Sequence, residues 1–157
     1  MRRVLIITAV LVLGAGAVFA QSAEQQIVGI ENGVLFAYNL NTDDLGVGQE
    51  TAINLSLTDS IQAGFVYIDG DGGTGLPDHT LLRLSYLIQG GLGMNVSAGL
   101  RGGNPAAGVG IFANVFSQTF QDTLFTALGL RVDYLTTTAV AVTEGVLTAG
   151  LSVKIGM

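Results

Sequence analysis

VLTAGLSVKIGM, residues 146–157, alternates between two kinds of side chain along its whole length. Successive side chains of a β-strand point to opposite faces, so a period of two predicts a strand with two chemically different faces. One face is apolar throughout and consists of Leu147, Ala149, Leu151, Val153, Ile155 and Met157. The other face is mostly small or polar and consists of Val146, Thr148, Gly150, Ser152, Lys154 and Gly156.

The same alternation recurs upstream, most clearly over 82–89, 94–101 and 124–134. β-branched and aromatic residues are frequent in these stretches, which favours strands over helices. We predict eight strands, at 33–41, 50–58, 60–69, 79–89, 92–102, 106–117, 122–135 and 143–157.

The predicted connections are of two kinds. Those after the second, fourth and sixth strands are short, at 58–60, 89–91 and 117–121. The others are longer, at 41–49, 70–78 and 136–142, except for the short stretch 103–105. Short turns at one end and longer loops at the other are typical of an up-and-down barrel with an even number of strands. The predicted fold is therefore an all-β, eight-stranded antiparallel transmembrane barrel.

The composition agrees with a surface that does not face water. The chain has 157 residues, of which 49% are hydrophobic and only 11% are charged. An ordinary soluble domain has about 25% charged residues. A soluble β-sandwich also alternates, but its solvent face would carry more charged residues than the Gly, Ser, Asn and Ala found here. The absence of cysteine excludes disulfides, zinc–thiolate sites and thiol nucleophiles.

The N-terminus has the features of an export signal. Arg2 and Arg3 precede the apolar run 4–13, and small residues end the segment at Ala20. We predict a cleaved signal peptide at 1–20 and a barrel at 21–157. A membrane anchor is the alternative, although the apolar run is short for a helix that spans a bilayer.

The four basic residues that follow Ala20 all lie on the less apolar strand faces: Arg83, Arg101, Arg131 and Lys154. We predict that they enter the barrel interior and meet Asp133 and Glu144 there. An eight-stranded barrel has room for little more than side chains, which favours a stabilising charge network over the alternative, a narrow anion path. With twelve acids, the exported chain has a net charge of −8, so nucleic acid is not an expected partner.

Three tyrosines, Tyr38, Tyr67 and Tyr134, fall on apolar faces near the loop ends of their strands. This placement favours an aromatic girdle at the level of lipid headgroups. The alternative is that aromatic residues are simply common in strands.

These features together resemble the small eight-stranded outer-membrane barrels of diderm bacteria, the OmpA- and OmpX-like group. The resemblance covers about residues 27–157 and implies localisation in the bacterial outer membrane. It also implies that Leu151, Val153, Ile155 and Met157 form an assembly signal for the outer-membrane insertion machinery. Met157 departs from the terminal aromatic residue usual in that group. Expected partners are outer-membrane lipid, the insertion machinery and periplasmic chaperones.

No catalytic, cofactor or metal site is predicted. His79 and Ser85 are separated by about 20 Å along a strand, which argues against a triad, and we interpret His79 as a surface loop residue. Asp69 to Gly73 resembles the start of a calcium loop, but the twelfth position is Thr80 instead of glutamate. We interpret this loop as acidic and flexible, with weak calcium binding left open. Gly90 to Gly93 is interpreted as a turn.

The sequence supports three functional hypotheses. The first is a non-enzymatic outer-membrane barrel with a largely filled polar lumen and a structural or surface-interaction role. The second is a narrow pore or carrier for small molecules. The third is an extracellular β-rich subunit that assembles with copies of itself.

Overall fold

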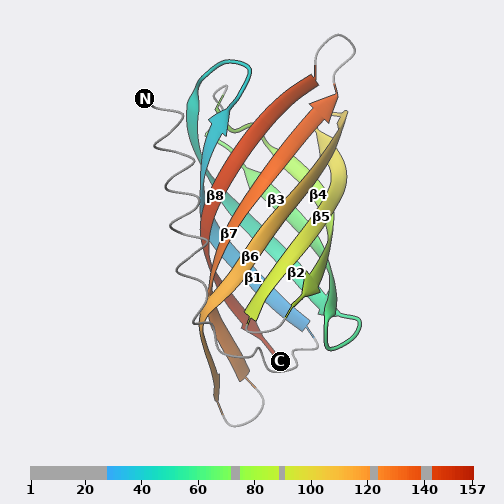
Figure 1. Cartoon of the computed structure of the whole chain (residues 1–157), viewed down its shortest axis with the longest axis vertical. Coiled ribbons are helices and arrows are strands. Elements are labelled where there is room, and N and C mark those ends of the chain that lie inside the picture. Colours follow the sequence, from blue (N-terminus) through green and yellow to red (C-terminus); the bar gives the residue numbers. More distant parts are fainter. Residues whose placement is uncertain (1–27, 72–74, 89–90, 121–123, 139–142) are drawn as a thin grey trace.

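The computed structural model confirms an all-β, closed barrel of eight antiparallel strands (Figure 1). It describes residues 28–71, 75–88, 91–120, 124–138 and 143–157; the predicted signal peptide and its cleavage site lie outside these ranges. No helix within them is long and apolar enough to cross a membrane. The strands are β1 Val28–Asn39, β2 Leu45–Ser56, β3 Ile61–Asp69, β4 His79–Leu87, β5 Leu92–Arg101, β6 Asn104–Phe120, β7 Leu124–Thr138 and β8 Thr143–Gly156.

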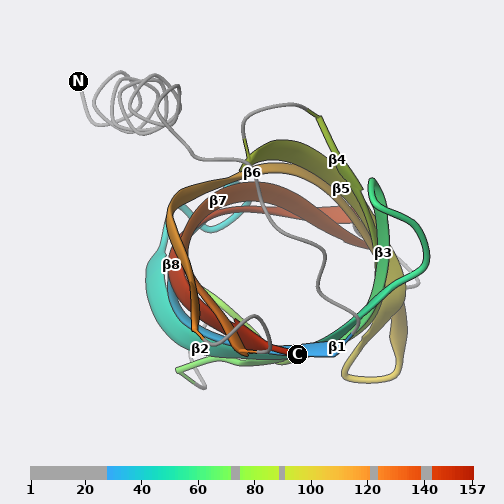
Figure 2. The same cartoon turned by 90° about the horizontal axis from the view of Figure 1, so that it is seen from below.

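Each strand pairs with its sequence neighbours, and β1 also pairs with β8 from Gly29↔Gly156 to Asn39↔Val146. Figure 2 shows this closure end-on. Closure leaves no strand edge with unpaired backbone groups, which is what a barrel in lipid requires. We call the end that carries the connections after β1, β3, β5 and β7 the loop side, and the other end the turn side.

Burial alternates along the strands, as the sequence period predicts. In β1, Glu31, Leu35 and Ala37 are buried, whereas Val34 and Phe36 are exposed. The buried set points into the barrel and the exposed set away from it.

Several strand boundaries differ from the prediction. β1 begins at Val28 instead of 33, and β2 begins at Leu45 instead of 50. The connection predicted at 41–49 is therefore a tight turn over 40–44, in which Asp43 has a positive φ of 59°. The prediction missed these strand ends because inward-facing glycines there replace the side chains that would reveal alternation.

β6 ends at Phe120 instead of 117, and β7 begins at Leu124 instead of 122 but extends to Thr138 instead of 135. The pairing of β6 with β5 stops at Ala113, and its register with β7 shifts between Asn114 and Phe116. Beyond this bulge β6 pairs only with β7, and the hairpin of β6 and β7 projects from the turn side (Figure 1).

The connection after β3 packs against the barrel mouth. The backbone N–H of Gly70 donates to Asp78 Oδ1 at 2.8 Å, and that of Val47 donates to Asp71 Oδ2 at 3.4 Å. Leu76 is fully buried. It belongs to an apolar cluster at the loop side with Leu35, Ala37, Ala52, Val66, Ile68, Leu81, Ala106, Leu135 and Val146.

Candidate functional site: the lumen network and the outer wall

The centre of the interior holds a buried carboxylate between two arginines. Arg83 Nη1 and Nη2 each donate to Glu50 at 3.0 Å, one to each carboxylate oxygen. Arg131 Nη1 donates to Glu50 Oε1. The side chains of Arg83 and Glu50 are only 6% and 2% exposed. Two-point pairing of arginine with carboxylate fixes both groups in orientation as well as in charge.

Arg131 extends this group to the opposite side of the lumen. Its Nε and Nη2 lie 2.6 Å and 2.5 Å from Asp133 Oδ2. Asn95 Nδ2 donates to Asp133 Oδ1 at 3.0 Å. One chain of hydrogen-bonded charged and amide groups thus links β2, β4, β5 and β7. We call this chain, formed by Glu50, Arg83, Asn95, Arg131 and Asp133, the lumen network.

Glu31 holds a second group nearer the turn side. Its carboxylate accepts from Ser152 Oγ at 2.6 Å and from Asn54 Nδ2 at 3.3 Å. Lys154 Nζ lies 3.7 Å from Glu31 Oε2 and 4.8 Å from the centroid of the Phe112 ring. Lys154 therefore has both an ionic partner and an aromatic face beside it.

The fourth predicted cation stands apart. Arg101 pairs with Glu144 at the loop side, and these side chains are 20% and 31% exposed. The structure therefore places Arg83, Arg131 and Asp133 together, Lys154 in the neighbouring group, and Arg101 outside both.

Sequence reasoning missed the two glutamates at the centre of these groups, Glu31 and Glu50. Glu31 lay outside the predicted first strand, and Glu50 stood at the first position of the predicted second strand. The alternation of β1 contains the missing signal: Gly29, Glu31, Gly33 and Leu35 share one face.

The two interior groups balance in charge, with three cations, Arg83, Arg131 and Lys154, facing three carboxylates, Glu31, Glu50 and Asp133. Burying unpaired charges would be costly, so this balance is a condition for a stable filled lumen. A cavity of about 10 Å³ remains among these side chains, roughly the room that one water needs. The charged side chains of the described strands therefore occupy the centre of the lumen.

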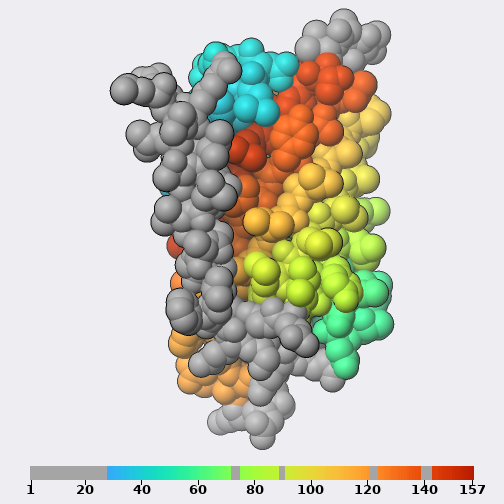
Figure 3. All heavy atoms as spheres, in the orientation of Figure 1, coloured from blue at the N-terminus to red at the C-terminus, as the bar shows by residue number. Residues whose placement is uncertain are grey.

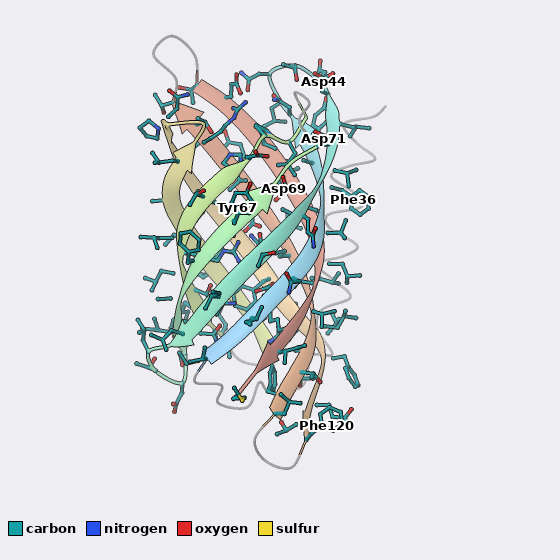
Figure 4. All side chains as sticks on the ribbon, turned by 180° about the vertical axis from the view of Figure 1, so that it is seen from behind. Phe36, Asp44, Tyr67, Asp69, Asp71 and Phe120 are labelled. Carbon is teal, nitrogen blue, oxygen red and sulfur yellow. The ribbon has the colours of Figure 1, made fainter. Side chains whose placement is uncertain are left out.

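The outer wall is apolar. Residues such as Ile53, Val96 and Val109 are more than half exposed, at 55%, 53% and 56%. Figure 3 shows that the side chains of β5 to β7 form a continuous surface on the visible face. Figure 4 shows Phe36 projecting outward from the wall, with Asp44 and Asp71 close to the loop-side end.

The three predicted girdle tyrosines lie on this outer wall. Tyr67 and Tyr134 are exposed, whereas Tyr38 is half-buried and donates from its hydroxyl to Asp43 Oδ1 at 2.6 Å. All three lie toward the loop side. Tyr86, which the sequence reasoning did not include, is exposed near the turn-side end of β4.

The predicted assembly residues also face outward, on the last strand and directly after it. Leu151, Val153, Ile155 and Met157 are 47%, 51%, 49% and 75% exposed. They form one apolar stripe down to the turn side.

His79 was wrongly interpreted as a surface loop residue. It begins β4, points inward and is only 1% exposed, with Nδ1 lying 2.7 Å from the carbonyl oxygen of Pro77. No local pattern in the sequence indicates that the preceding loop packs against the barrel mouth, next to His79. His79 and Ser85 lie near opposite ends of β4, as the strand spacing predicted.

The described residues contain no group of three or more His, Cys, Asp or Glu side chains placed to hold a metal ion. In the acidic loop, Gly72 and Gly73 lie outside those residues. In the glycine-rich stretch, Gly91 has a positive φ of 77°, as a turn glycine does.

No protein-family model matches the chain, and no curated protein matches it significantly. Among the solved structures that resemble it, two have a TM-score of 0.49 each. One comes from work on the de novo design of transmembrane beta-barrels; it is 16% identical, and the match covers 84% of this chain and 99% of that one. The other is the crystal structure of Neisserial surface protein A, which is 12% identical, with 83% and 97% covered.

Proposed function

We propose that this chain is an outer-membrane β-barrel with a closed lumen and a non-enzymatic structural or surface-interaction role. The observation that carries the proposal is the inversion of ordinary globular packing. The charged groups Arg83, Glu50 and Arg131 are buried inside, while large apolar residues cover the outside. Such a wall is stable only against lipid or another apolar surface.

The filled lumen favours this role over a pore. A pore needs a continuous polar path wide enough for a hydrated solute. Here the lumen network crosses the interior from β2 to β7, and the apolar cluster around Leu76 lies between it and the loop side. The barrel then acts as an anchor that holds its loops at the membrane surface.

The remaining expectations belong to the same proposal. Export through a signal peptide at 1–20 would deliver the chain to the periplasmic chaperones. The outward apolar stripe from Leu151 to Met157 would be the segment that the insertion machinery recognises. Tyr67 and Tyr134 would sit at the headgroup level of one leaflet.

Two measurements on the full mature chain in lipid vesicles and planar bilayers test the proposal. We expect a compact gel band that shifts on boiling, as for a folded barrel, and no steady single-channel current. Stable conductance in the folded protein would support the pore instead. A folded species that stays in solution without detergent or lipid would support the self-assembling subunit.

A further inference from the structure

The apolar part of the outer wall is shorter on β3 and β4 than on β7 and β8. β3 and β4 have 9 residues each, whereas β7 and β8 have 15 and 14. On β3 the outward apolar residues run from Ile61 to Tyr67, and the next outward residue is the exposed carboxylate Asp69. On β8 they run without interruption from Leu147 to Met157.

β4 has the same limit as β3. Its outward apolar residues run from Leu82 to Ile88, which directly follows the strand, and the exposed polar residue Thr80 precedes them. In Figure 4, Asp69 lies clearly below Asp44, which marks the loop-side end. We call β3 and β4 the short side of the wall.

Polar side chains border the short side and continue onto β2. Asp69 pairs in register with Gln49, and Tyr67 pairs with Thr51. Gln49 and Thr51 are exposed on the outward face of β2. We call Gln49, Thr51, Asp69 and Thr80 the polar border.

The register determines how much of the barrel axis each apolar run covers. Following register partners once around the barrel from Val28 leads to Tyr38, ten residues further along β1. With about 4.8 Å between strands and about 3.3 Å per residue, this stagger gives a strand tilt of about 40°. The run from Ile61 to Tyr67 then covers about 15 Å of the axis, and the run from Leu147 to Met157 about 25 Å.

Only the longer of these runs matches a bilayer, since the apolar band of an outer-membrane barrel is about 25 Å tall. A tilt of the whole barrel does not remove the difference, because it moves both ends of one wall in the same direction and leaves the length of the wall unchanged. At full bilayer thickness, Asp69 and Thr80 would lie in hydrocarbon. Placing such groups there is unfavourable.

We infer that the barrel thins the bilayer beside the short side, so that lipid headgroups of the loop-side leaflet descend to the polar border. A wall shorter than the hydrocarbon thickness is accommodated by thinning of the lipid around it. The Gln49 amide and the Thr51 and Thr80 hydroxyls offer hydrogen bonds to the ester and headgroup oxygens of phospholipids. Beside β7 and β8 the bilayer keeps its full thickness. The inference rests on the proposed membrane location.

Tryptophan depth measurements test the inference, because the chain contains no tryptophan. Leu82→Trp on β4 and Val109→Trp on β6, a strand of 17 residues, replace exposed apolar residues. The strand rise and tilt place the two positions at about the same height along the axis. The full mature chain is reconstituted in phosphatidylethanolamine–phosphatidylglycerol vesicles that contain lipids brominated either near the headgroup or near the chain end. We expect position 82 to lie about 5 Å shallower than position 109, because two leaflets share the shortage. Equal depths would overturn the inference.

A second pair separates thinning from tilt. Tyr86→Trp and Leu128→Trp lie at about the same height near the turn side of β4 and β7. Thinning makes position 86 the shallower of the two, whereas a tilted barrel that brings position 82 toward the surface moves position 86 deeper. A deeper position 86 would therefore contradict thinning.

Lengthening the apolar run should reduce the thinning. In the Leu82→Trp chain, we expect the combined substitutions Asp69→Leu and Thr80→Leu to move position 82 deeper by about 5 Å. Thr136→Leu, an outward residue near the loop-side end of β7, is the matched control and should leave this depth unchanged. An unchanged depth in the Asp69 and Thr80 variant would also contradict the inference.

The same spectra separate this inference from the proposed membrane location. Deep and equal quenching at positions 82 and 109 in chains that show the boiling-dependent gel shift contradicts only the thinning. Quenching of both positions by aqueous iodide, and by neither brominated lipid, contradicts the membrane location itself.

Discussion

The loop-side part of the barrel interior and the part below it are both filled, but with opposite kinds of side chain. Toward the loop side, Leu35, Leu76 and Leu81 form an apolar cluster that resembles the core of a soluble protein. Below it, Glu50 and Arg131 belong to a network of buried charges. Apolar packing tolerates small changes of shape, whereas a buried charge requires its partner. The lower part should therefore respond more strongly to single substitutions.

The largest effect is expected for Glu50→Leu. The substitution leaves two buried arginines, Arg83 and Arg131, without their shared carboxylate. We expect the free energy of unfolding in detergent micelles to fall by about 3–5 kcal/mol, measured by urea titration. The matched control is Glu144→Leu, which breaks the more exposed pair with Arg101 and should cost about 1 kcal/mol or less. Equal losses would show that burial does not set the strength of these pairs.

A smaller effect is expected in the apolar part. Leu76→Ala removes a fully buried side chain from the loop-side cluster. We expect a loss of about 2–3 kcal/mol, because the cavity left behind closes only partly. The same titration applies, with Leu40→Ala, an exposed leucine in the first turn, as control. A Leu76 variant as stable as this control would mean that the loop does not contribute to the packed interior.

The smallest effect is expected in the group nearer the turn side, where an aromatic ring lies beside a buried cation. Phe112→Leu keeps an apolar side chain but removes the aromatic face beside the Lys154 ammonium group. We expect a loss of about 1 kcal/mol. A double-mutant cycle with Lys154→Met isolates the pair from the change in shape. Additive losses would show that the ring and the ammonium group do not interact.

The alternation of side chains explains which parts of the fold and of the lumen network could be predicted from the sequence. Alternation predicted the eight strands, the inward positions of Arg83 and Arg131 and the outward face of β8, because lipid and lumen impose opposite chemistry at every second residue. It did not reveal Glu31 or Glu50 as partners. On their inward faces both residues stand next to glycines, which interrupt the pattern of side chains. Pairing across a barrel also depends on the register between strands, which the alternation within one strand does not determine.

The packing of the connection after β3 against the barrel mouth could not be predicted from the sequence either. Gly46 has no side chain, and a Cβ there would meet the backbone of Gly75 and Leu76. The space for this loop, which joins β3 to β4, is therefore created by a glycine on β2. For the same reason His79 was taken for a surface residue, since its burial depends on this loop.

A depth profile in lipid tests the central claim that the outer wall spans a bilayer. The chain contains no tryptophan, so single substitutions Leu92→Trp, Val96→Trp and Leu100→Trp place one fluorophore at the turn end, the middle and the loop end of β5. Lipids brominated near the end of their acyl chains quench tryptophan that lies deep in the bilayer. We expect strong quenching at position 96 and weaker quenching at 92 and 100. Weak quenching at all three positions, with strong quenching by aqueous iodide, would contradict a membrane-spanning wall.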